Sequence, residues 1–378
     1  MNMRRKHAIR ASGFTLLEMM IALTLGIIVI GSAVQLFSKG MELTFLVSQR
    51  AEMQQNGRAA VGLLAKDISL AGAGLPTGGV ALPTGTVRAP IYGCDQVKCY
   101  VSGVNPAGVA YPNNQLYGVI PGDGLGIPMK LGGANTDIIT IVYTDPSSPL
   151  TLGYTITAFG ANGTSITVAP PSPMPNPPIP TLQDPAVGIK VGDLILVSNN
   201  GLPAVGEVTG IVGNVINFAD LDRLNINQST APGGNLKTIC NPCGAVPPPP
   251  AVAPTAIRIL AITYYLDVPP GPDGLRYTAD DLPPRLMRQV NGQTAVPVAD
   301  NIGDLQFSYD IFDDTLGADT SNLADAGMSI GKSPNQIRKV NIVSMTTRSS
   351  MHGKVGFQGI DLATSVSVRN MSFRDRYQ

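Results

Sequence analysis

A long apolar run near the start of the chain is the clearest pattern in the sequence. It extends from Phe14 to Phe37 and contains a single charged residue, Glu18. As a helix the run would be about 36 Å long, which is enough to cross the hydrocarbon core of a bilayer. The pattern therefore predicts a membrane-spanning helix over residues 14–37.

The pattern then changes to that of an amphipathic helix. Beyond Lys39 the apolar residues recur mostly three, four or seven positions apart, which places them on one helix face with polar residues opposite. The members of this stripe are Leu43, Leu46, Val47, Met53, Ala60, Val61, Leu64 and Ile68. Gly72 and Gly74, followed by Pro76, end the pattern. We expect one helix over about residues 15–71, roughly 85 Å long, whose amphipathic half falls within 38–75.

From about residue 76 the sequence is typical of a β-rich head. Short β-rich segments alternate with Gly, Pro and Asn, and the proline-dense stretches 170–180 and 246–254 indicate extended loops. The expected strands are Thr136–Tyr143, Gly153–Thr157, Ser165–Ala169, Asp193–Ser198, Val205–Ile211, Asn214–Phe218, Ala256–Leu266, Arg285–Val290, Asp304–Asp310, Arg338–Thr347 and Ala363–Arg369. Two of them, 256–266 and 285–290, would form a hairpin with an inserted loop. We expect an α+β fold in which the long N-terminal helix packs on antiparallel sheet.

Composition narrows the range of functions. Only 14% of residues are charged, and 42 glycines and 32 prolines suit a loop-rich domain. Basic and acidic residues balance at 26 each, but the basic residues of stretch 4–10 leave the rest of the chain mildly acidic. We therefore expect no nucleic-acid binding. Because His7 and His352 are the only histidines, we expect no histidine-based metal site or catalytic triad. Since a catalytic motif is missing as well, we expect no cofactor and no enzyme activity.

The order of parts at the N-terminus differs from that of a secretory signal. The basic stretch 4–10 precedes the apolar run, so the positive-inside rule keeps the N-terminus cytoplasmic and places everything after Phe37 outside the cytoplasm. A secretory signal would carry its small-residue cleavage site after the run. Here the small residue Gly13 lies before the run. Cleavage there would remove the charges and leave the helix on the product.

Glu18 requires a partner within the apolar span. A carboxylate there costs about 2.5–3.5 kcal/mol on insertion scales, and no basic residue lies near it along the helix. A cut after Gly13 would expose the α-amine of Phe14 four residues before Glu18. This amine, from the same chain or from an adjacent subunit, would pair with the carboxylate. Pairing between subunits would set the axial register of a helix bundle.

The segment GFTLLE, from Gly13 to Glu18, follows a short basic leader and resembles the class III signal of type IV prepilins and pseudopilins. The resemblance implies that residues 1–13 are a leader, cleaved between Gly13 and Phe14 by a prepilin peptidase, and that Phe14 is then N-methylated. It also implies that Glu18 pairs with a neighbour's N-terminus. The alternative is an ordinary signal anchor. Many major pilins have a helix-breaking proline near the end of the membrane run, where this chain has Gln35.

The C-terminal part, 256–378, resembles the PilW family of minor pilins and, more distantly, the J-type pseudopilins of type II secretion. The segments that carry this resemblance are 262–266, 285–290, 298–307 and 338–348. It implies a minor pilin that joins other minor pilins and the major pilin in priming pilus assembly, at or near the tip. Further implied partners are the inner-membrane assembly platform and, before assembly, membrane lipid. Residues 76–255 carry no resemblance and would be an elaborated part of the head.

Two other functions stay open. A J-type pseudopilin of a type II secretion system would share the signal and the helix. A membrane-anchored extracytoplasmic binding module would instead keep its leader and present a functional cleft.

The four cysteines fall into two local pairs, Cys94 with Cys99 and Cys240 with Cys243. Their expected location outside the cytoplasm favours structural disulfides. A four-cysteine zinc site, a redox role for the C-x-x-C pair and pairing between the two clusters are the alternatives.

Carboxylates also cluster in two loops, at 273–281 and 310–314, where they could supply oxygen ligands to calcium. Neither segment matches a calcium-binding loop pattern, so solvated turn residues are the preferred interpretation. We expect no metal site.

Overall fold

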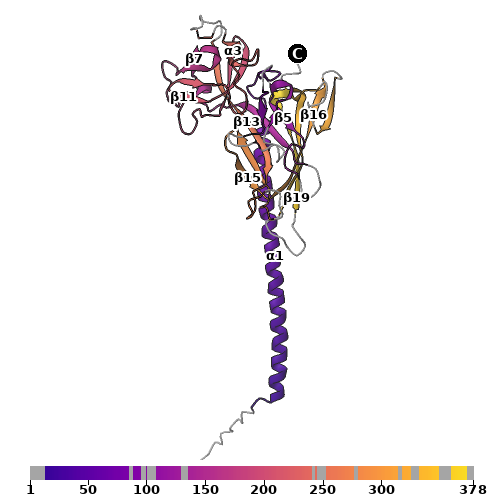
Figure 1. The fold of residues 1–378 in the computed structure, drawn as a ribbon. Coiled ribbons are helices and arrows are strands. Elements are labelled where there is room, and N and C mark those ends of the chain that lie inside the picture. Colours follow the sequence, from indigo (N-terminus) through magenta and orange to yellow (C-terminus); the bar gives the residue numbers. More distant parts are fainter. Residues whose placement is uncertain are drawn as a thin grey trace, which may run out of the picture. The chain divides into compact units, whose positions relative to one another are not determined.

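The computed structural model divides into two compact units, Met1–Glu52 and Met53–Gln378. A single long helix, α1 (Leu16–Leu70), belongs to both (Figure 1). The leader residues 1–12 and most of the proline-rich stretch 246–254 lie outside the described residues. The described residues are 13–84, 88–94, 99, 108–128, 135–240, 243–244, 253–275, 280–313, 317–324, 332–348 and 359–372.

Helix α1 confirms the helix expected at about 15–71. Its C-terminal end is set by backbone conformation, because Gly72 and Gly74 have φ angles of +76° and +73°, a region that glycine enters without steric cost. The backbone N–H of Gly72 then donates to the carbonyl of Val142 at 2.9 Å. The chain thus passes from the helix directly onto the edge of a sheet strand.

The largest sheet of the second unit has seven antiparallel strands in the order β10-β9-β13-β14-β15, with β6 beside β13 and β5 beside β6. Its strands are β5 (Val119–Gly122), β6 (Ile138–Thr144), β9 (Leu194–Asn199), β10 (Leu202–Glu207), β13 (Thr255–Asp267), β14 (Arg285–Val290) and β15 (Val296–Asp300). The register pairs Tyr264 with Arg288, which confirms the expected hairpin of β13 and β14.

Two four-stranded antiparallel sheets and two small ladders complete the second unit. The orders are β17-β16-β18-β19 and β11-β12-β8-β7, with β1 beside β4 and β2 beside β3. Their strands are β1 (Val80–Ala81), β2 (Ile91–Tyr92), β3 (Val109–Ala110), β4 (Gln115–Leu116), β7 (Thr155–Phe159), β8 (Ser165–Ala169), β11 (Gly210–Val212), β12 (Val215–Asn217), β16 (Ile302–Asp313), β17 (Ala318–Leu323), β18 (Ile337–Arg348) and β19 (Gly359–Ser367). The short helices are η1 (Pro112–Asn114), α2 (Pro149–Leu152), η2 (Ala161–Gly163), α3 (Leu236–Ile239), η3 (Pro334–Gln336) and α4 (Arg369–Ser372).

Three hydrophobic cores hold these layers together. In the first, Leu64 and Ile68 of α1 are fully buried against residues of β6, β13, β16 and β18. A Cβ at Gly57 of α1 would clash with the side chains of Leu362 and Thr347, so this glycine permits the close approach of helix and β19. The second core packs residues 75–120 against the main sheet. The third core lies in the part of the chain that follows β6 and precedes β13, residues 145–254, which we call the lobe. This arrangement is the expected α+β fold.

Several strand predictions need correction. The segment 205–211 is not one strand: β10 ends at Glu207 and β11 begins at Gly210, because Thr209 already donates to Asn217 of a different sheet. The closing strand, expected at 363–369, is β19 at 359–367. It is followed at Arg369 by helix α4, whose Met371 is buried. Strands β1 to β5, β15 and β17 have no counterpart among the predictions.

Candidate functional site

The start of α1 carries its own cap. Glu18 Oε2 accepts a hydrogen bond from the backbone N–H of Thr15 at 2.9 Å, and Thr15 Oγ1 accepts one from the N–H of Glu18 at 3.2 Å. The Thr15 hydroxyl also donates to Oε2 at 3.0 Å. This reciprocal pair is a capping box, and the T-x-x-E spacing that signals it is visible in the sequence. Both bonds to the carboxylate end on Oε2, so Oε1 has no partner among the described residues.

The predicted cleavage site lies just outside this cap. Gly13 and Phe14 precede the helix, and a Cβ built on Gly13 would meet no atom within 4 Å. Phe14 is 84% exposed. The structure therefore places Glu18 in the first turn of α1, with Gly13 and Phe14 just before the helix begins. Both residues that flank the predicted cleavage site are therefore exposed in the structure.

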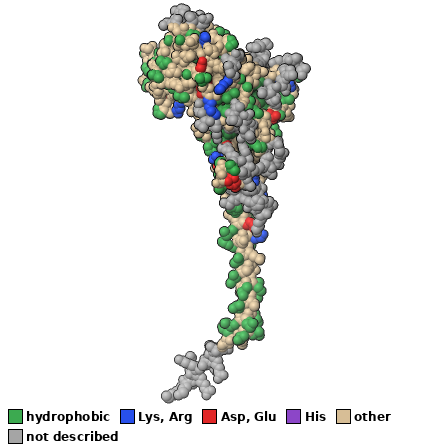
Figure 2. Space-filling view, in the orientation of Figure 1, with side chains coloured by type: hydrophobic (Ala, Val, Ile, Leu, Met, Phe, Trp, Pro, Cys, Tyr) green, Lys and Arg blue, Asp and Glu red, His purple; other side chains and the backbone are tan. Residues whose placement is uncertain are grey.

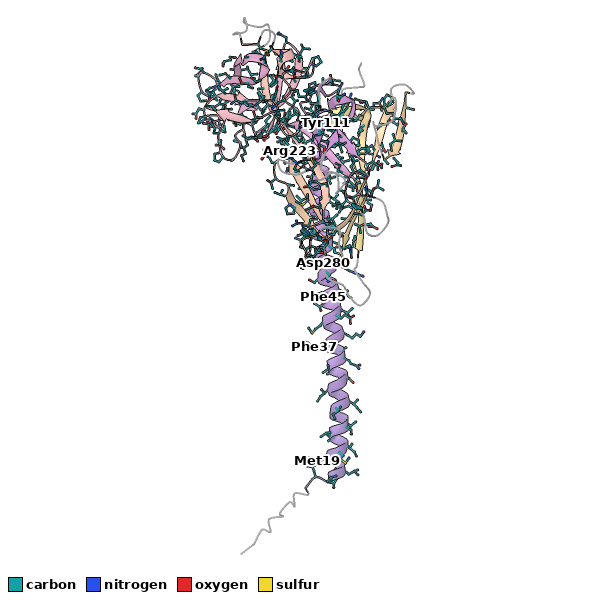
Figure 3. All side chains as sticks on the ribbon, in the orientation of Figure 1. Met19, Phe37, Phe45, Tyr111, Arg223 and Asp280 are labelled. Atoms are coloured by element: carbon teal, nitrogen blue, oxygen red, sulfur yellow. A yellow bond between two sulfur atoms is a disulfide. The ribbon has the colours of Figure 1, made fainter. Side chains whose placement is uncertain are left out.

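The first half of α1 presents apolar side chains on its surface. Figure 2 shows them along the helix, and Figure 3 shows Met19, Phe37 and Phe45 projecting from it. Within the described residues, α1 is the one helix long and apolar enough to cross a membrane. A continuous exposed apolar surface of this kind needs lipid or other helices to cover it.

A buried cluster ties the second half of α1 to the main sheet. Asp67, 2% exposed, accepts hydrogen bonds from Tyr143 of β6 at 3.1 Å and from Tyr264 of β13 at 2.6 Å. It also accepts one from Arg288 Nε of β14 at 2.9 Å. Burial, followed by the nearby Asp67 carboxylate, raises the pKa of both tyrosine hydroxyls well above the usual range. Both phenols therefore stay protonated and act as donors. This cluster is not among the features predicted from the sequence.

A second buried ion cluster joins the main sheet to the lobe. Arg258 of β13 donates to Asp145 from Nε at 2.9 Å and from Nη2 at 2.5 Å, and it lies 3.3 Å from Asp193. Its Nη1 also donates to the carbonyl of Gly188 at 2.6 Å. Burial acts to raise the pKa of Asp145, but hydrogen bonds from Ser147 and the Arg258 ion pair outweigh it and lower the pKa. The cluster is a set of ion pairs and hydrogen bonds that joins β13 to the segments that contain Asp145, Gly188 and Asp193.

Asp137, at the start of β6, is a buried carboxylate with a perturbed pKa. It accepts hydrogen bonds from the backbone N–H groups of Gly124 at 2.8 Å and Phe307 at 2.7 Å. Burial raises its pKa to about 6, with smaller contributions from the charges of Asp123 and Asp304, although the two hydrogen bonds oppose the shift. Asp137, immediately before β6, thus links the turn after β5 to β16, and its pKa lies within an accessible pH range.

The structure joins both cysteine pairs as local disulfides, Cys94 with Cys99 and Cys240 with Cys243. The sulfurs are therefore not paired between the two clusters. The second disulfide follows the short helix α3, whose N-cap Asn235 accepts from the N–H of Thr238.

The acidic loops make local contacts. Asp273 accepts from the N–H of Leu275 at 2.8 Å, and Asp280 accepts from the N–H of Asp273 at 3.4 Å, as turn carboxylates do. Asp310 pairs with Lys339 at 2.6 Å. In the part of the chain that the structure describes, no group of three or more His, Cys, Asp or Glu is arranged to hold a metal. Residue 314 and both histidines lie outside the described residues.

Comparison with protein families identifies the N-terminal segment. Residues 9–34 match the family model described as the prokaryotic N-terminal methylation motif. The chain carries a class III prepilin signal. The match confirms the resemblance of the segment GFTLLE to a prepilin signal. It supports the interpretation that the chain is a membrane-anchored, type IV pilin-like protein of a pilus or pseudopilus. Processing by a prepilin peptidase and assembly with pilus components follow from such a signal. Comparison with curated proteins and comparison with solved structures each gave no match.

Proposed function

We propose that this chain is a minor type IV pilin that resembles the PilW family, helps to prime pilus assembly and lies at or near the tip. The observation that carries the proposal is the prepilin signal at 9–34, joined to an exposed apolar helix with one carboxylate in its first turn. The large second unit, Met53–Gln378, supports a minor role, because bulky heads fit poorly along a whole filament. The proposal gives the chain no catalytic step and no cofactor.

The geometry of the first turn suggests how the signal would act. Cleavage between Gly13 and Phe14 would leave a charged α-amine one residue before Thr15. Within hydrocarbon the free N–H groups at the helix start need partners, and the Thr15–Glu18 capping box supplies partners for two of them, those of Thr15 and Glu18. Glu18 Oε1 would then accept the methylated amine of an adjacent subunit, forming a charge-assisted hydrogen bond. Removal of the leader would therefore create the donor that recruits the chain into a bundle.

The proposal also sets the location and the partners. The chain would span the inner membrane once, with its N-terminus cytoplasmic and its head periplasmic, and would then leave the membrane for the filament. Its partners would be the prepilin peptidase, the assembly platform, other minor pilins and the major pilin, with lipid covering α1 before assembly. No nucleic-acid contact is proposed.

The main alternative is a J-type pseudopilin of a type II secretion system, because the methylation motif is shared by pili and pseudopili. Deletion of the chain separates the two: loss of surface pili supports the proposal, whereas loss of a secreted protein with normal piliation supports the alternative. A membrane-anchored binding module is the second alternative. It would retain its leader and belong to no filament.

The first test is mass spectrometry of the mature N-terminus. We expect the chain purified from membranes to begin at Phe14 with one methyl group on its α-amine. A strain without prepilin peptidase is the control and should yield the full leader. A chain that keeps residues 1–13 in the wild-type strain would overturn the proposal.

Two variants of Glu18 separate capping from charge pairing. Glu18→Gln can still close the capping box, because a glutamine side chain accepts the same backbone hydrogen bond. Glu18→Ala removes both the cap and the charge. We expect both variants to insert into the membrane and both to be recruited poorly into pili. Normal recruitment of Glu18→Gln would show that the charge has no part in assembly.

A further inference from the structure

Two buried carboxyl groups lie in contact within the lobe. Glu207, the last residue of β10, is 2% exposed, and Asp222 is 8% exposed. Their side chains are hydrogen-bonded to each other. An ionised carboxylate is only an acceptor, so two ionised carboxylates cannot share a hydrogen bond. The contact therefore requires a proton on one of these two residues, which we call the acid pair.

The proton of the acid pair lies on Glu207. Asp222 accepts a hydrogen bond from the N–H of Ile226 at 2.9 Å through Oδ2 and one from the N–H of Asn227 at 2.7 Å through Oδ1. Backbone donors on both oxygens favour the ionised form of a carboxyl group. Burial nevertheless raises the pKa of Asp222, because it outweighs the hydrogen bonds from Glu207, Ile226 and Asn227. Asp222 is thus the acceptor, and the pair as a whole resists the loss of its proton.

The acid pair joins a surface loop, residues 219–229, to the edge of the main sheet, where β10 is the last strand. Asn227 of this loop also binds the backbone of Glu207. Its Oδ1 accepts from the N–H of Glu207 at 2.9 Å, and its Nδ2 donates to the carbonyl of Glu207 at 2.7 Å. The side chain and the backbone of Glu207 therefore both hold the same loop.

The loop in turn holds the segment around β2. The carbonyl of Leu224 accepts from the N–H of Ile91 at 2.9 Å, and Gln228 Nε2 donates to the carbonyl of Arg88 at 3.0 Å. Leu224 and Ile226 are buried in the second core. Release of the loop from β10 would therefore loosen both the segment around β2 and part of this core.

The other polar side chains around the acid pair do not titrate with it. Burial, followed by the nearby Tyr92 and the acid pair itself, raises the pKa of Tyr111 far above the usual range, so its hydroxyl stays protonated. Arg223, in the same loop, donates from Nη2 to Sγ of Cys99 at 3.9 Å. Figure 3 labels Tyr111 and Arg223. In the described part of the chain, the remaining charged side chains on the loop, on the segment before β2 and on α3 are Asp220, Arg88 and Lys237.

We propose that the acid pair is a pH-sensitive switch, which holds the loop 219–229 on β10 while Glu207 keeps its proton and releases the loop when a rise in pH removes it. Two negative charges would then face each other in a buried site, where the low effective dielectric makes their repulsion large. β10 is paired with β9 along its whole length, so the loop is the part that moves. The proposal does not rest on the proposed function, because it needs no filament and no partner.

The direction of the pH effect follows from proton binding. In the open state both carboxyl groups are in water and ionise at about pH 4. The closed state keeps one proton more. The closed state is therefore most stable at low pH and loses stability as pH rises towards the raised pKa of the pair. In that interval the ratio of open to closed molecules should rise up to about tenfold for each pH unit.

The test is hydrogen exchange of the full-length chain in detergent micelles, followed by mass spectrometry between about pH 5 and pH 8. Rates are corrected for the intrinsic rate of exchange, which itself rises with pH. The informative amides are those of Glu207, Ile226 and Asn227, because each donates to a group of the switch. We expect their protection to fall with rising pH, while peptides from β13 keep theirs. Constant protection, or an equal fall in β13, would overturn the proposal without the need for any variant.

Two variants identify the group that titrates. Glu207→Gln keeps a donor towards Asp222 but has no proton to lose, so protection of the loop should no longer depend on pH. Asp220→Asn is the matched control. It neutralises an exposed carboxylate of the same loop, which binds Ser229 and not the acid pair, and it should keep the pH dependence of the parent. A pH dependence that survives in Glu207→Gln, or that disappears in Asp220→Asn, would refute the assignment of the switch to the acid pair.

Discussion

The tie between α1 and the sheet through Asp67 leads to a quantitative prediction. Asp67→Ala removes a buried acceptor and leaves two phenol hydroxyls and one guanidinium without it. Each hydrogen bond to a charged group is worth about 1.5–3 kcal/mol. The three are not additive, because they share one carboxylate. Arg288, whose side chain is 23% exposed, can also recover water. We expect the variant to lower the free energy of unfolding of the head by about 3–5 kcal/mol, as for other broken buried pairs.

Variants that each remove one hydrogen bond of the Asp67 cluster show how much each bond contributes to this loss of unfolding free energy. Tyr264→Phe and Tyr143→Phe each remove one donor to the carboxylate and should each cost about 1.5–3 kcal/mol. Tyr264→Phe should cost more, because its bond to Asp67 is 2.6 Å against 3.1 Å for Tyr143. Asp67→Asn keeps the shape and one good acceptor, so its effect should lie between those of Tyr264→Phe and Asp67→Ala.

The assay is chemical denaturation of the full-length chain in detergent micelles. The chain has 11 tyrosines and no tryptophan, so tyrosine fluorescence and near-ultraviolet circular dichroism report on the head. Lys66→Ala, at an exposed position next to Asp67, is the control and should be close to neutral. A double-mutant cycle of Asp67→Asn with Tyr264→Phe should give a coupling of about 1 kcal/mol or more. A loss below about 1 kcal/mol for Asp67→Ala, or no coupling in the cycle, would refute the assigned role.

Two further predictions concern the other buried charges. Because burial raises the pKa of Asp137 from its ordinary value of 3.8 to about 6, the folded state binds a proton that the unfolded state has released. The contribution of this group to the free energy of unfolding therefore falls as pH rises from about 4 to 6. Asp137→Asn should flatten the dependence of the unfolding free energy on pH, measured by denaturation across this range. An unchanged pH dependence would contradict the assignment. Arg258→Met should lower the free energy of unfolding by about 3–5 kcal/mol by leaving two buried carboxylates unpaired. Arg258→Lys should recover only part of this loss, because a lysine cannot form the fork with Asp145; equal stability of Arg258→Lys and the parent would count against it.

The sequence was sufficient to predict the helix and the strands whose ends are marked by residues within or next to the element. The helix expected at about 15–71 is observed at Leu16–Leu70, because glycines at 72 and 74 end it through backbone conformation. Strands β8 and β14 match their predicted bounds, and both are short segments with clear turns on either side. The strand predicted at 205–211 was wrong although a usable signal was present. Asn200-Gly201 is a hairpin turn, with both φ angles positive, and it starts β10 at Leu202.

The first turn shows how one residue can carry two signals. Glu18 was identified as a carboxylate in an apolar run, and its proposed role is to pair with an amine. The same residue, three positions after Thr15, is also the second half of a capping box. The cap explains why a carboxylate is tolerated at the start of a helix before any partner subunit arrives. The pairing with an amine remains a prediction, to be tested with the glutamine variant.

What the sequence could not provide is the choice of partners across long separations. β6 and β13 are hydrogen-bonded neighbours, yet β6 ends at Thr144 and β13 begins at Thr255, with the whole lobe between them. Asp67 illustrates the consequence, because its donors Tyr264 and Arg288 are 197 and 221 residues away. A carboxylate on the buried face of an amphipathic helix must find donors, since burying it alone is too costly. That requirement was readable from Asp67 between the apolar residues Leu64 and Ile68. The identity of the donors was not, because it depends on which strands the sheet places beneath the helix.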